Sequence, residues 1–333
     1  MDITFFHWAH GSDSSIKRSF KPLISELKKN NNVSEYSVPY LGANPLNVIK
    51  NIWFVYKHRN KKGINHVTGD IHYCILGLIG VRTVLTIHDD YAYSQAKRGI
   101  LDKLYKYLFW LYFPIKIADR VTCISPETKY QIDRLVKNKK TQLLPQHSLD
   151  DKYKAYPRSK NEKPILLQIG TAPQKNLART MHAIQGLNVQ LHVIRPMTDK
   201  QIALAESLNI DYINLYDLSD DEIIEEYIKA DIVLFPSLKE GFGMPVIEAQ
   251  SMGRPVITSN IQPMTWVAGD DYPLLINPLS EDELRICITN LLNDRSLYER
   301  AVGIGKTNVC RFSTRIVAGN FQKLYNDLQD GHK

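Results

Sequence analysis

Two glutamates flank a glycine-rich turn in the stretch FPSLKEGFGMPVIEAQSMGRPV, residues 235–256. Glu240 and Glu248 lie eight positions apart, and two glycines and a proline stand between them. A carboxylate can accept two hydrogen bonds from a vicinal diol, and such charge-assisted bonds are strong. The pair therefore suits a ligand that carries several hydroxyl groups.

The segments on either side of this turn indicate how the two acids are positioned. Residues 231–237, DIVLFPS, have the composition of a buried strand, and PVIEAQSM (245–252) is typical of a helix with proline in its first turn. We expect the turn between them to bring backbone N–H groups close to a ligand, because glycine adopts positive φ freely. The start of the helix offers unpaired N–H groups and a partial positive charge, which favour an anion.

An anion site beside two carboxylates favours a sugar nucleotide as the ligand. One glutamate would hold hydroxyls of the sugar, the helix start the diphosphate, and the other glutamate the ribose diol. A structural interpretation stays open for each acid taken alone. Glu248 can be an acid that the helix dipole stabilises, and Glu240 can be a loop acid.

The rest of the chain predicts the framework that holds these residues. Val- and Ile-rich runs alternate with helical segments, at residues 3–8, 64–69, 83–89, 121–125 and 141–145, and then at 164–170, 189–195, 212–216, 231–237, 255–259 and 273–277. Runs without polar alternation are buried on both faces, and helices between them imply right-handed crossovers and a parallel sheet. The pattern predicts a doubly wound α/β fold that is built twice.

The predicted boundaries follow the composition. Residues 147–164, HSLDDKYKAYPRSKNEKP, are polar, charged and without helical period, so they predict a linker. We place a first domain at 1–150, the linker at 151–163, a second domain at 164–310, and a C-terminal helix at 311–333 that packs back toward the first domain. KKNNN, residues 28–32, is expected to be an exposed loop. In two such domains, ligands are expected at the carboxyl ends of the strands, in a cleft between the sheets.

Composition narrows the class of protein. The 333 residues are 44% hydrophobic and 23% charged, which is ordinary for a soluble globular protein. The four cysteines form no CxxC pair, as expected in a reducing compartment. The N-terminal residues lack the layout of a signal peptide, and no apolar run has the length of a membrane span. We therefore expect a cytoplasmic protein.

The net charge of +7 is partly concentrated in two segments that mix cations with aromatic residues, 50–63 (KNIWFVYKHRNKKG) and 97–120. Such segments can lie on an anionic membrane surface, which would make the protein peripheral on a membrane. They can equally be amphipathic helices packed on their own domain, with the lysines outside. No nucleic-acid partner is expected, because no recognition-helix or zinc-finger pattern is present.

Several other chemistries are excluded by spacing. GIGKT, residues 303–307, lacks the earlier glycine of a phosphate-binding P-loop, because Arg300 stands in its place. No G-x-G-x-x-G follows a strand, and His66, His72 and His88 form no helical metal pair. The chain has no Asp-x-Asp, so we expect it to bind phosphates without Mg²⁺, with no metal site and no cofactor.

Ordered stretches over about the second half of the chain resemble one enzyme family. FPSLKEGFGMPVIEAQSMGRPVITSN is similar to the E-x7-E signature of the family 4 glycosyltransferases, the group 1 type of retaining enzyme with the GT-B fold. IGTAPQKNLARTMHAI (169–184) resembles the strand, loop and Lys-Asn helix start of that family. The first half matches more loosely, at VLTIHDD, VTCISPETKYQI and LLPQHSLD. The resemblance implies two Rossmann-like domains that face each other across a cleft.

The resemblance also implies roles for residues of the second domain. Glu248 corresponds to the glutamate that binds the donor ribose, Glu240 to the one that contacts the donor sugar, and Lys175 to the lysine that neutralises the diphosphate. The end of the strand at 164–170 and the signature turn would also line the donor. The residues concerned are Gly170, Thr171, Gly241, Phe242, Gly243 and Met244.

In the first domain the resemblance implies two further sites. His88 corresponds to the histidine that faces the reacting sugar, so the catalytic set would be His88, Glu240 and Lys175. Gly11 and Ser12 lie where the family has a glycine-rich diphosphate loop, although HGSDSSIKR lacks its paired glycines. Two more departures are Thr171, where many relatives have an arginine, and Trp266, where a glutamate is common.

Taken together, these residues predict a retaining glycosyltransferase. It would move a sugar from a nucleotide diphosphate donor to a glycan or lipid-linked glycan, in bacterial surface polysaccharide synthesis such as that of lipopolysaccharide or capsule. Two alternatives stay open: a sugar-nucleotide epimerase of the same fold, which needs no acceptor, and a non-catalytic subunit that binds sugar nucleotides.

Overall fold

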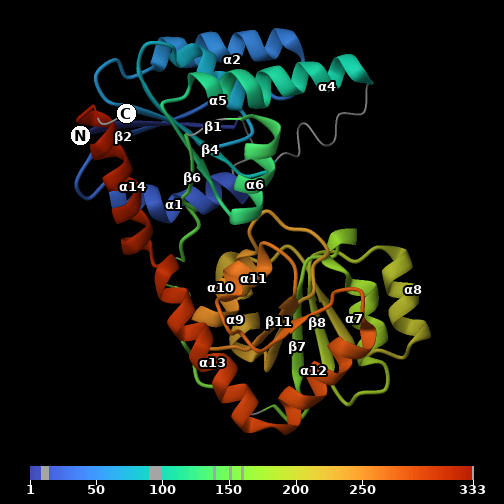
Figure 1. Cartoon of the computed structure of the whole chain (residues 1–333). Helices are drawn as coiled ribbons and strands as arrows, with labels where there is room; N and C mark the ends of the chain where they lie inside the picture. The colour runs from blue at the N-terminus through green and yellow to red at the C-terminus, as the bar shows by residue number, and fades with distance from the viewer. Residues whose placement is uncertain (9–14, 90–98, 138–139, 150–151, 159–160, 332–333) are drawn as a thin grey trace. The chain divides into compact units, whose positions relative to one another are not determined.

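The computed structural model describes residues 1–8, 15–89, 99–137, 140–149, 152–158 and 161–331. Their contacts divide the chain into two compact units (Figure 1). Unit 1 is Met1–Ser148 with Ser313–Lys333, and unit 2 is Leu149–Phe312. Gly11 and Ser12 lie outside the described residues.

Unit 1 is built on a sheet of six parallel strands in the order β2-β1-β3-β4-β5-β6. The strands are β1 Asp2–His7, β2 Asn32–Ser37, β3 Ile64–Val67, β4 Arg82–Ile87, β5 Arg120–Cys123 and β6 Thr141–Leu143. Five of them match predicted runs. The sixth, β2, was not predicted, because its residues are polar and mostly exposed, as an edge strand allows.

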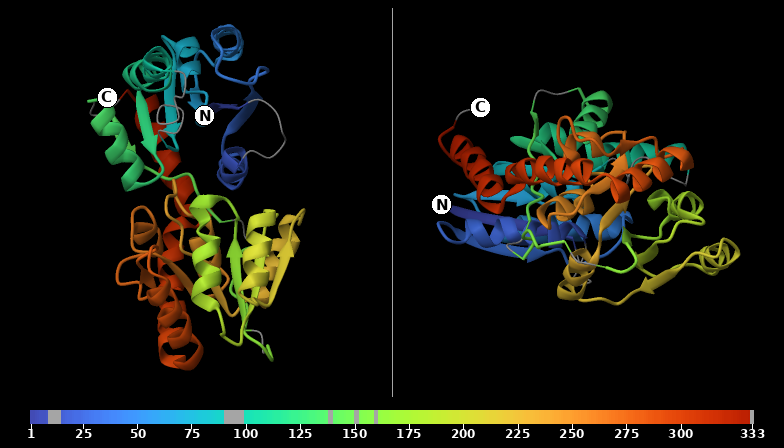
Figure 2. Two further views of the ribbon diagram at one scale, coloured as in Figure 1. Left: turned by 90° about the vertical axis from the view of Figure 1, so that its right-hand side faces the viewer. Right: turned by 90° about the horizontal axis from the view of Figure 1, so that it is seen from below.

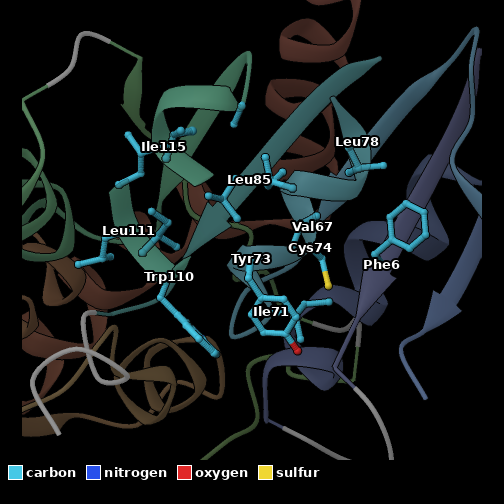
Figure 3. Close-up of a cluster of buried hydrophobic side chains, with 14 of the residues drawn as sticks. Phe6, Val67, Ile71, Tyr73, Cys74, Leu78, Leu85, Trp110, Leu111 and Ile115 are labelled. Atoms are coloured by element: carbon cyan, nitrogen blue, oxygen red, sulfur yellow. The ribbon is translucent and has the colours of Figure 1, made fainter. Parts of the chain in front are cut away.

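Helices cover both faces of this sheet (Figure 1, Figure 2). One apolar cluster joins Phe5 of β1 to α1 Ser15–Leu27 and α14 Thr314–Gln329. The next residue, Phe6, points to the opposite face, into a second cluster that Figure 3 shows. That cluster joins the sheet to α2 Pro45–His58, the 3₁₀ helix η1 His72–Leu78, the π-helical η2 Tyr107–Tyr112, α5 Phe113–Ile117 and α6 Pro126–Leu135. The short helix α4, Ile100–Lys106, precedes η2.

The last helix, α14, is part of unit 1 although it is the end of the chain. Its Phe321 and Tyr325 are fully buried against α1 and the sheet. The Tyr325 hydroxyl lies 2.7 Å from Nδ1 of His66, which stands on β3. The helix thereby completes the hydrophobic cover of one sheet face.

Unit 2 repeats the architecture with a sheet of six parallel strands in the order β12-β11-β10-β7-β8-β9. The strands are β7 Ile165–Ile169, β8 Gln190–Ile194, β9 Tyr212–Leu215, β10 Ile232–Phe235, β11 Val256–Ser259 and β12 Leu275–Ile276. Every one lies within a predicted run. Two doubly wound parallel sheets, as the sequence predicts, are thus confirmed.

Among the described residues, the helices of unit 2 lie between these strands along the chain, and three more follow the last strand. They are η3 Pro173–Lys175, α7 Leu177–Ile184, α8 Asp199–Ser207, α9 Asp220–Lys229, α10 Met244–Ser251, α11 Met264–Ala268, α12 Glu281–Asn293, α13 Arg295–Val309 and η4 Cys310–Phe312. None of the helices in the described part of the chain is long and apolar enough to cross a membrane.

The segment predicted as a linker makes many contacts within unit 2. Arg254 is 1% exposed and donates hydrogen bonds to the carbonyl oxygens of Tyr156 and Pro157, at 3.0 and 2.8 Å. Arg158 pairs with Asp231 at 2.9 Å. Residues 156–158 of the predicted linker are therefore held on unit 2 by side-chain hydrogen bonds and an ion pair, and they belong to no strand.

Three buried histidines should make unit 1 sensitive to acid. Burial lowers the pKa of His66 to about 3 and those of His72 and His88 to about 4, from an ordinary 6.5. Between pH 6.5 and about 4 the unfolded chain then binds protons that the folded chain does not, so stability falls as the pH falls. Each histidine contributes at most about 1.4 kcal/mol per pH unit.

We expect His66→Gln to flatten this dependence, because an amide does not titrate. The measurement is the free energy of unfolding in urea, at neutral and mildly acidic pH, for the unchanged chain and for the variant. The spectroscopic signal that is followed should come from unit 1. An equal slope in the two chains would show that folding does not lower the pKa of His66.

Candidate functional site

In unit 2 the carboxyl ends of β7 and β10 bring the predicted residues together. The two strands are direct neighbours, with Leu166 opposite Ile232. They lie where the strand order reverses, because β8 and β9 extend to one side and β11 and β12 to the other. Ligands of doubly wound sheets bind at this point. The loops that leave the two strands carry Lys175 and Glu240.

Lys175 and Glu240 form an ion pair at this edge. Lys175 Nζ lies 2.6 Å from Glu240 Oε1, and the two side chains are 20% and 15% exposed. The ammonium group also lies 4.6 Å from the centre of the Phe235 ring, which ends β10. An accessible cation and carboxylate in contact can serve a ligand that carries both phosphate and hydroxyl groups.

Gly170 makes room for the stem of Lys175. It follows β7 with φ +98°, and a Cβ atom there would lie 2.9 Å from Lys175 Cγ and 3.2 Å from its Cε. A side chain would therefore displace the lysine. The backbone of Lys175 is fixed as well, because Gln168 Nε2 donates to its carbonyl oxygen at 2.9 Å.

Asn176 fixes the start of α7. The family resemblance marked a Lys-Asn helix start here, but it predicted no role for the asparagine side chain. Asn176 has the left-handed conformation, with φ 64° and ψ 27°. Its buried Nδ2 donates to the carbonyl oxygens of Pro236 and Pro278, at 3.0 and 2.6 Å. The signal in the sequence is an asparagine directly before a helix, since asparagine is one of the few residues that adopt this conformation readily.

The signature turn leads into α10 as predicted. Gly243 precedes the helix with φ +110°, and a proline follows within its first turn. Phe242 is 3% exposed and packs edge-on against Trp266 and Phe312, with ring centres 6.2 and 5.5 Å away. Its side chain therefore anchors the turn in an aromatic cluster, so only its backbone can line a ligand. Gly241 and Met244 are partly exposed on either side.

Glu248 lies on α10, one turn beyond its start, and is partly buried. Its Oε2 accepts a hydrogen bond from the hydroxyl of Tyr227 at 2.6 Å. Tyr227 on α9 is fully buried, and burial followed by the Glu248 charge raises the pKa of its hydroxyl well above the usual value. Arg254 Nε in turn donates to the Tyr227 carbonyl oxygen at 3.0 Å. No pattern in the sequence marks Tyr227 as a functional residue, because a tyrosine on a helix is most often a core residue.

Thr171 contacts the neighbouring loop. Its hydroxyl donates to the carbonyl oxygen of Pro196 at 2.7 Å, and its own carbonyl oxygen accepts from Gln201 Nε2 at 2.7 Å. The residue in the position of the family arginine thus ties the ends of β7 and β8 together. Trp266 stacks with the guanidinium of Arg311, whose carbon lies 4.6 Å from the ring centre.

His88 is fixed at the carboxyl end of β4 in unit 1. Its Nε2 lies 2.9 Å from the Thr68 carbonyl oxygen, so this nitrogen carries the hydrogen. A Cβ at Gly69, where φ is +116°, would lie 2.6 Å from His88 Cδ2. With its pKa lowered to about 4 by burial, the ring is neutral at pH 7 and Nδ1 holds the free lone pair.

Part of the chain is similar in sequence to known glycosyltransferases. A family model described as glycosyl transferases group 1 matches residues 150–307. This segment is therefore similar to the group 1 glycosyl transferases. Serotype-specific mannosyltransferase WbdA of Escherichia coli is 29% identical over 179 residues, which make up 50% of this chain and 21% of WbdA.

Two more proteins extend the comparison. The capsular polysaccharide biosynthesis glycosyltransferase CapM of Staphylococcus aureus is 30% identical over 149 residues, 43% of this chain and 39% of CapM. The chain thus matches less than half the length of either relative. The structure of Anabaena HepE in complex with UDP and glucose superimposes with a TM-score of 0.76 at 11% identity, covering 98% of this chain and 100% of HepE. This likeness confirms the predicted GT-B fold class.

The contact between Gly170 and Lys175 can be tested by stability. We expect Gly170→Ala to destabilise unit 2 in two ways. An alanine with positive φ is strained, and its methyl group also collides with the lysine stem, which should add about 1–3 kcal/mol to the loss. Urea unfolding measures the difference.

The control for this substitution is Gly186→Ala. Gly186 also has positive φ, at +75°, but a Cβ there would meet no atom within 4 Å. It therefore reports the backbone strain alone. Equal losses in the two variants would show that Lys175 moves aside without cost.

Proposed function

We propose that this chain transfers a sugar from a nucleotide diphosphate donor to a hydroxyl group of a glycan or lipid-linked glycan. The observation that carries the proposal is the contact between Lys175 Nζ and Glu240 Oε1, at 2.6 Å, beside the start of α10. A cation, a carboxylate and a helix N-terminus are the groups that a nucleotide sugar requires.

The ion pair suggests how the donor enters. In the structure the two side chains neutralise each other, and a bound donor would separate them. The diphosphate would take Lys175 and the first N–H groups of α10, whereas a sugar hydroxyl would donate to Glu240. As the bond to the sugar breaks, charge develops on the diphosphate, and Lys175 with the helix start would stabilise it.

Glu248 would bind the ribose diol of the donor. The hydroxyl of Tyr227, a residue buried in the core of unit 2, donates a hydrogen bond to one of its oxygens at 2.6 Å. A carboxylate that already accepts one hydrogen bond has fewer orientations to lose when the diol binds. Tyr227 is therefore a positioning residue for the donor site in this proposal.

His88 would orient the reacting sugar, a role that follows from the family resemblance. Its neutral Nδ1 accepts a hydrogen bond, so a sugar hydroxyl is a suitable partner. Retention of anomeric configuration and independence from divalent cations also belong to the proposal. The departing phosphate would help to take the proton of the acceptor hydroxyl.

The relatives support a role in bacterial surface polysaccharide synthesis. CapM is named for capsular polysaccharide biosynthesis, and WbdA is a serotype-specific mannosyltransferase. HepE was solved with UDP and glucose, which supports a nucleotide-linked sugar as the donor here. We further propose that the chain works in the cytoplasm, at the membrane face where lipid-linked acceptors would be presented.

The first experiment is thermal unfolding with a panel of nucleoside diphosphates, repeated in EDTA. A ligand at one hundred times its Kd adds about 2.7 kcal/mol of stability. We expect one base to raise the Tm by several degrees, and the rise to survive EDTA because Lys175 and α10 neutralise the diphosphate. No shift with any base would refute the donor site.

Incubation with the corresponding nucleotide sugars separates the alternatives. A transferase releases nucleoside diphosphate when a glycan acceptor is supplied, whereas an epimerase converts the donor to an isomer without release. A binding subunit would leave the donor unchanged.

Tyr227→Phe tests the support of Glu248. Loss of one hydrogen bond should raise the Kd for the nucleoside diphosphate by about 2- to 10-fold, and Glu248→Ala should raise it further. Titration calorimetry measures both values.

Tyr298→Phe is the matched control, because Tyr298 is also buried in unit 2 and its hydroxyl has no hydrogen-bond partner among the described residues. Its Kd should equal that of the unchanged chain. An unchanged Kd for Tyr227→Phe would remove Tyr227 from the donor site and leave the other assignments intact.

A further inference from the structure

Helix α2 of unit 1 exposes a continuous apolar stripe. It packs on the second cluster of unit 1 through Val48 and Val55, which are 2% and 0% exposed. The opposite face would be polar in an ordinary surface helix. Here it carries four large apolar side chains with exposed fractions of 61, 63, 58 and 51%, at Leu46, Ile49, Trp53 and Tyr56. Their spacing of three and four residues places them on one side of the helix.

Cations surround this stripe. Lys57 Nζ lies 3.5 Å from the centre of the Trp53 ring, and Arg59 Cζ lies 3.9 Å from that of Tyr56. Residues 36–69 contain five lysines and arginines and no aspartate or glutamate. We call Leu46, Ile49, Lys50, Trp53, Tyr56 and Lys57 the α2 surface. It is apolar at its centre and positive around it.

A second exposed apolar group lies on the same side of unit 1. Ile100, Leu101 and Leu104 of α4 are 86, 81 and 50% exposed. α4 continues into η2, and η2, α5 and α2 all pack against η1. Figure 1 shows α2, α4 and α5 on the same face of the sheet of unit 1. The helix that carries the second group therefore packs in the same layer of helices as α2.

We propose that the α2 surface docks this protein on an anionic lipid membrane. Leucine and isoleucine enter the acyl boundary, and tryptophan and tyrosine suit the interface, where each ring has an apolar body and a polar tip. The long stems of Lys50 and Lys57 run beside the apolar stripe and can carry their charges to the phosphate level. A nucleic acid would use the cations alone and would leave Leu46 and Ile49 without a role. The inference stands on unit 1 and does not depend on the proposed function.

The test is co-sedimentation of the full chain with lipid vesicles. We expect binding to phosphatidylcholine vesicles that contain about one third phosphatidylglycerol, and at least about tenfold weaker binding to pure phosphatidylcholine. Raising the NaCl concentration to about 0.5 M should weaken the binding to anionic vesicles, because the charge attraction is screened.

Trp53→Glu should reduce binding to anionic vesicles at least about tenfold, because it replaces a membrane-inserting ring with a repelled charge. Ile286→Glu on α12 is the matched control: the side chain is likewise 58% exposed and the change in charge is the same. It should bind like the unchanged chain. Ile49→Gln with Trp53→Gln keeps the net charge and should also weaken binding, since the stripe itself is lost.

Thermal unfolding establishes that each variant is folded. Equal binding of Trp53→Glu and Ile286→Glu, or equal binding to neutral and anionic vesicles, would overturn the proposal. It would also be overturned if the unchanged chain dimerises in sedimentation velocity and Trp53→Glu abolishes the dimer without altering vesicle binding. The α2 surface would then be an interface between two copies.

Discussion

The pairing of β7 with β10 is the constraint on which the candidate site depends. Lys175 and Glu240 are 65 positions apart, and they meet because their strands are neighbours in one parallel sheet. Parallel strands end at the same edge, so both loops leave the sheet in the same direction. The reversal of strand order at this point keeps crossover helices away from the edge. Lys175 and Glu240 can thus remain accessible although their loops start from buried strands.

Backbone conformations at three positions then set the geometry of the site. Gly170, Asn176 and Gly243 all have positive φ, and each lies where the chain leaves a strand or enters a helix. Gly170 admits the lysine stem, Asn176 ties the start of α7 to the loop after β10, and Gly243 turns the chain into α10. Such conformations persist because the surrounding packing fixes them.

Buried polar side chains in the core of unit 2 form hydrogen bonds that support these loops and helices. Tyr227 orients Glu248, and the fully buried Arg254 donates to carbonyl oxygens of α9 and of residues 156 and 157. A buried guanidinium is costly unless its donors are satisfied, and here several carbonyl groups satisfy them. The site in unit 2 thus rests on polar contacts within the core, whereas unit 1 fixes His88 by burial against Gly69 and Thr68.

The sequence by itself determined the series of buried strands and the glycine and proline turn into α10, because each follows from local composition and backbone preference. It also carried the resemblance to the glycosyltransferase family, through the order of its motifs. Among the strands of the described residues, β2 alone was not predicted, since an edge strand needs no apolar run. The tertiary structure alone decided that Lys175 contacts Glu240, that Tyr227 supports Glu248, that Phe242 turns into the core, and that Thr171 binds the β8 loop. It also decided that one face of α2 is covered and the other, with Trp53, is exposed. These outcomes join residues far apart in the chain, and such contacts depend on how strands and helices pack, which no local pattern contains.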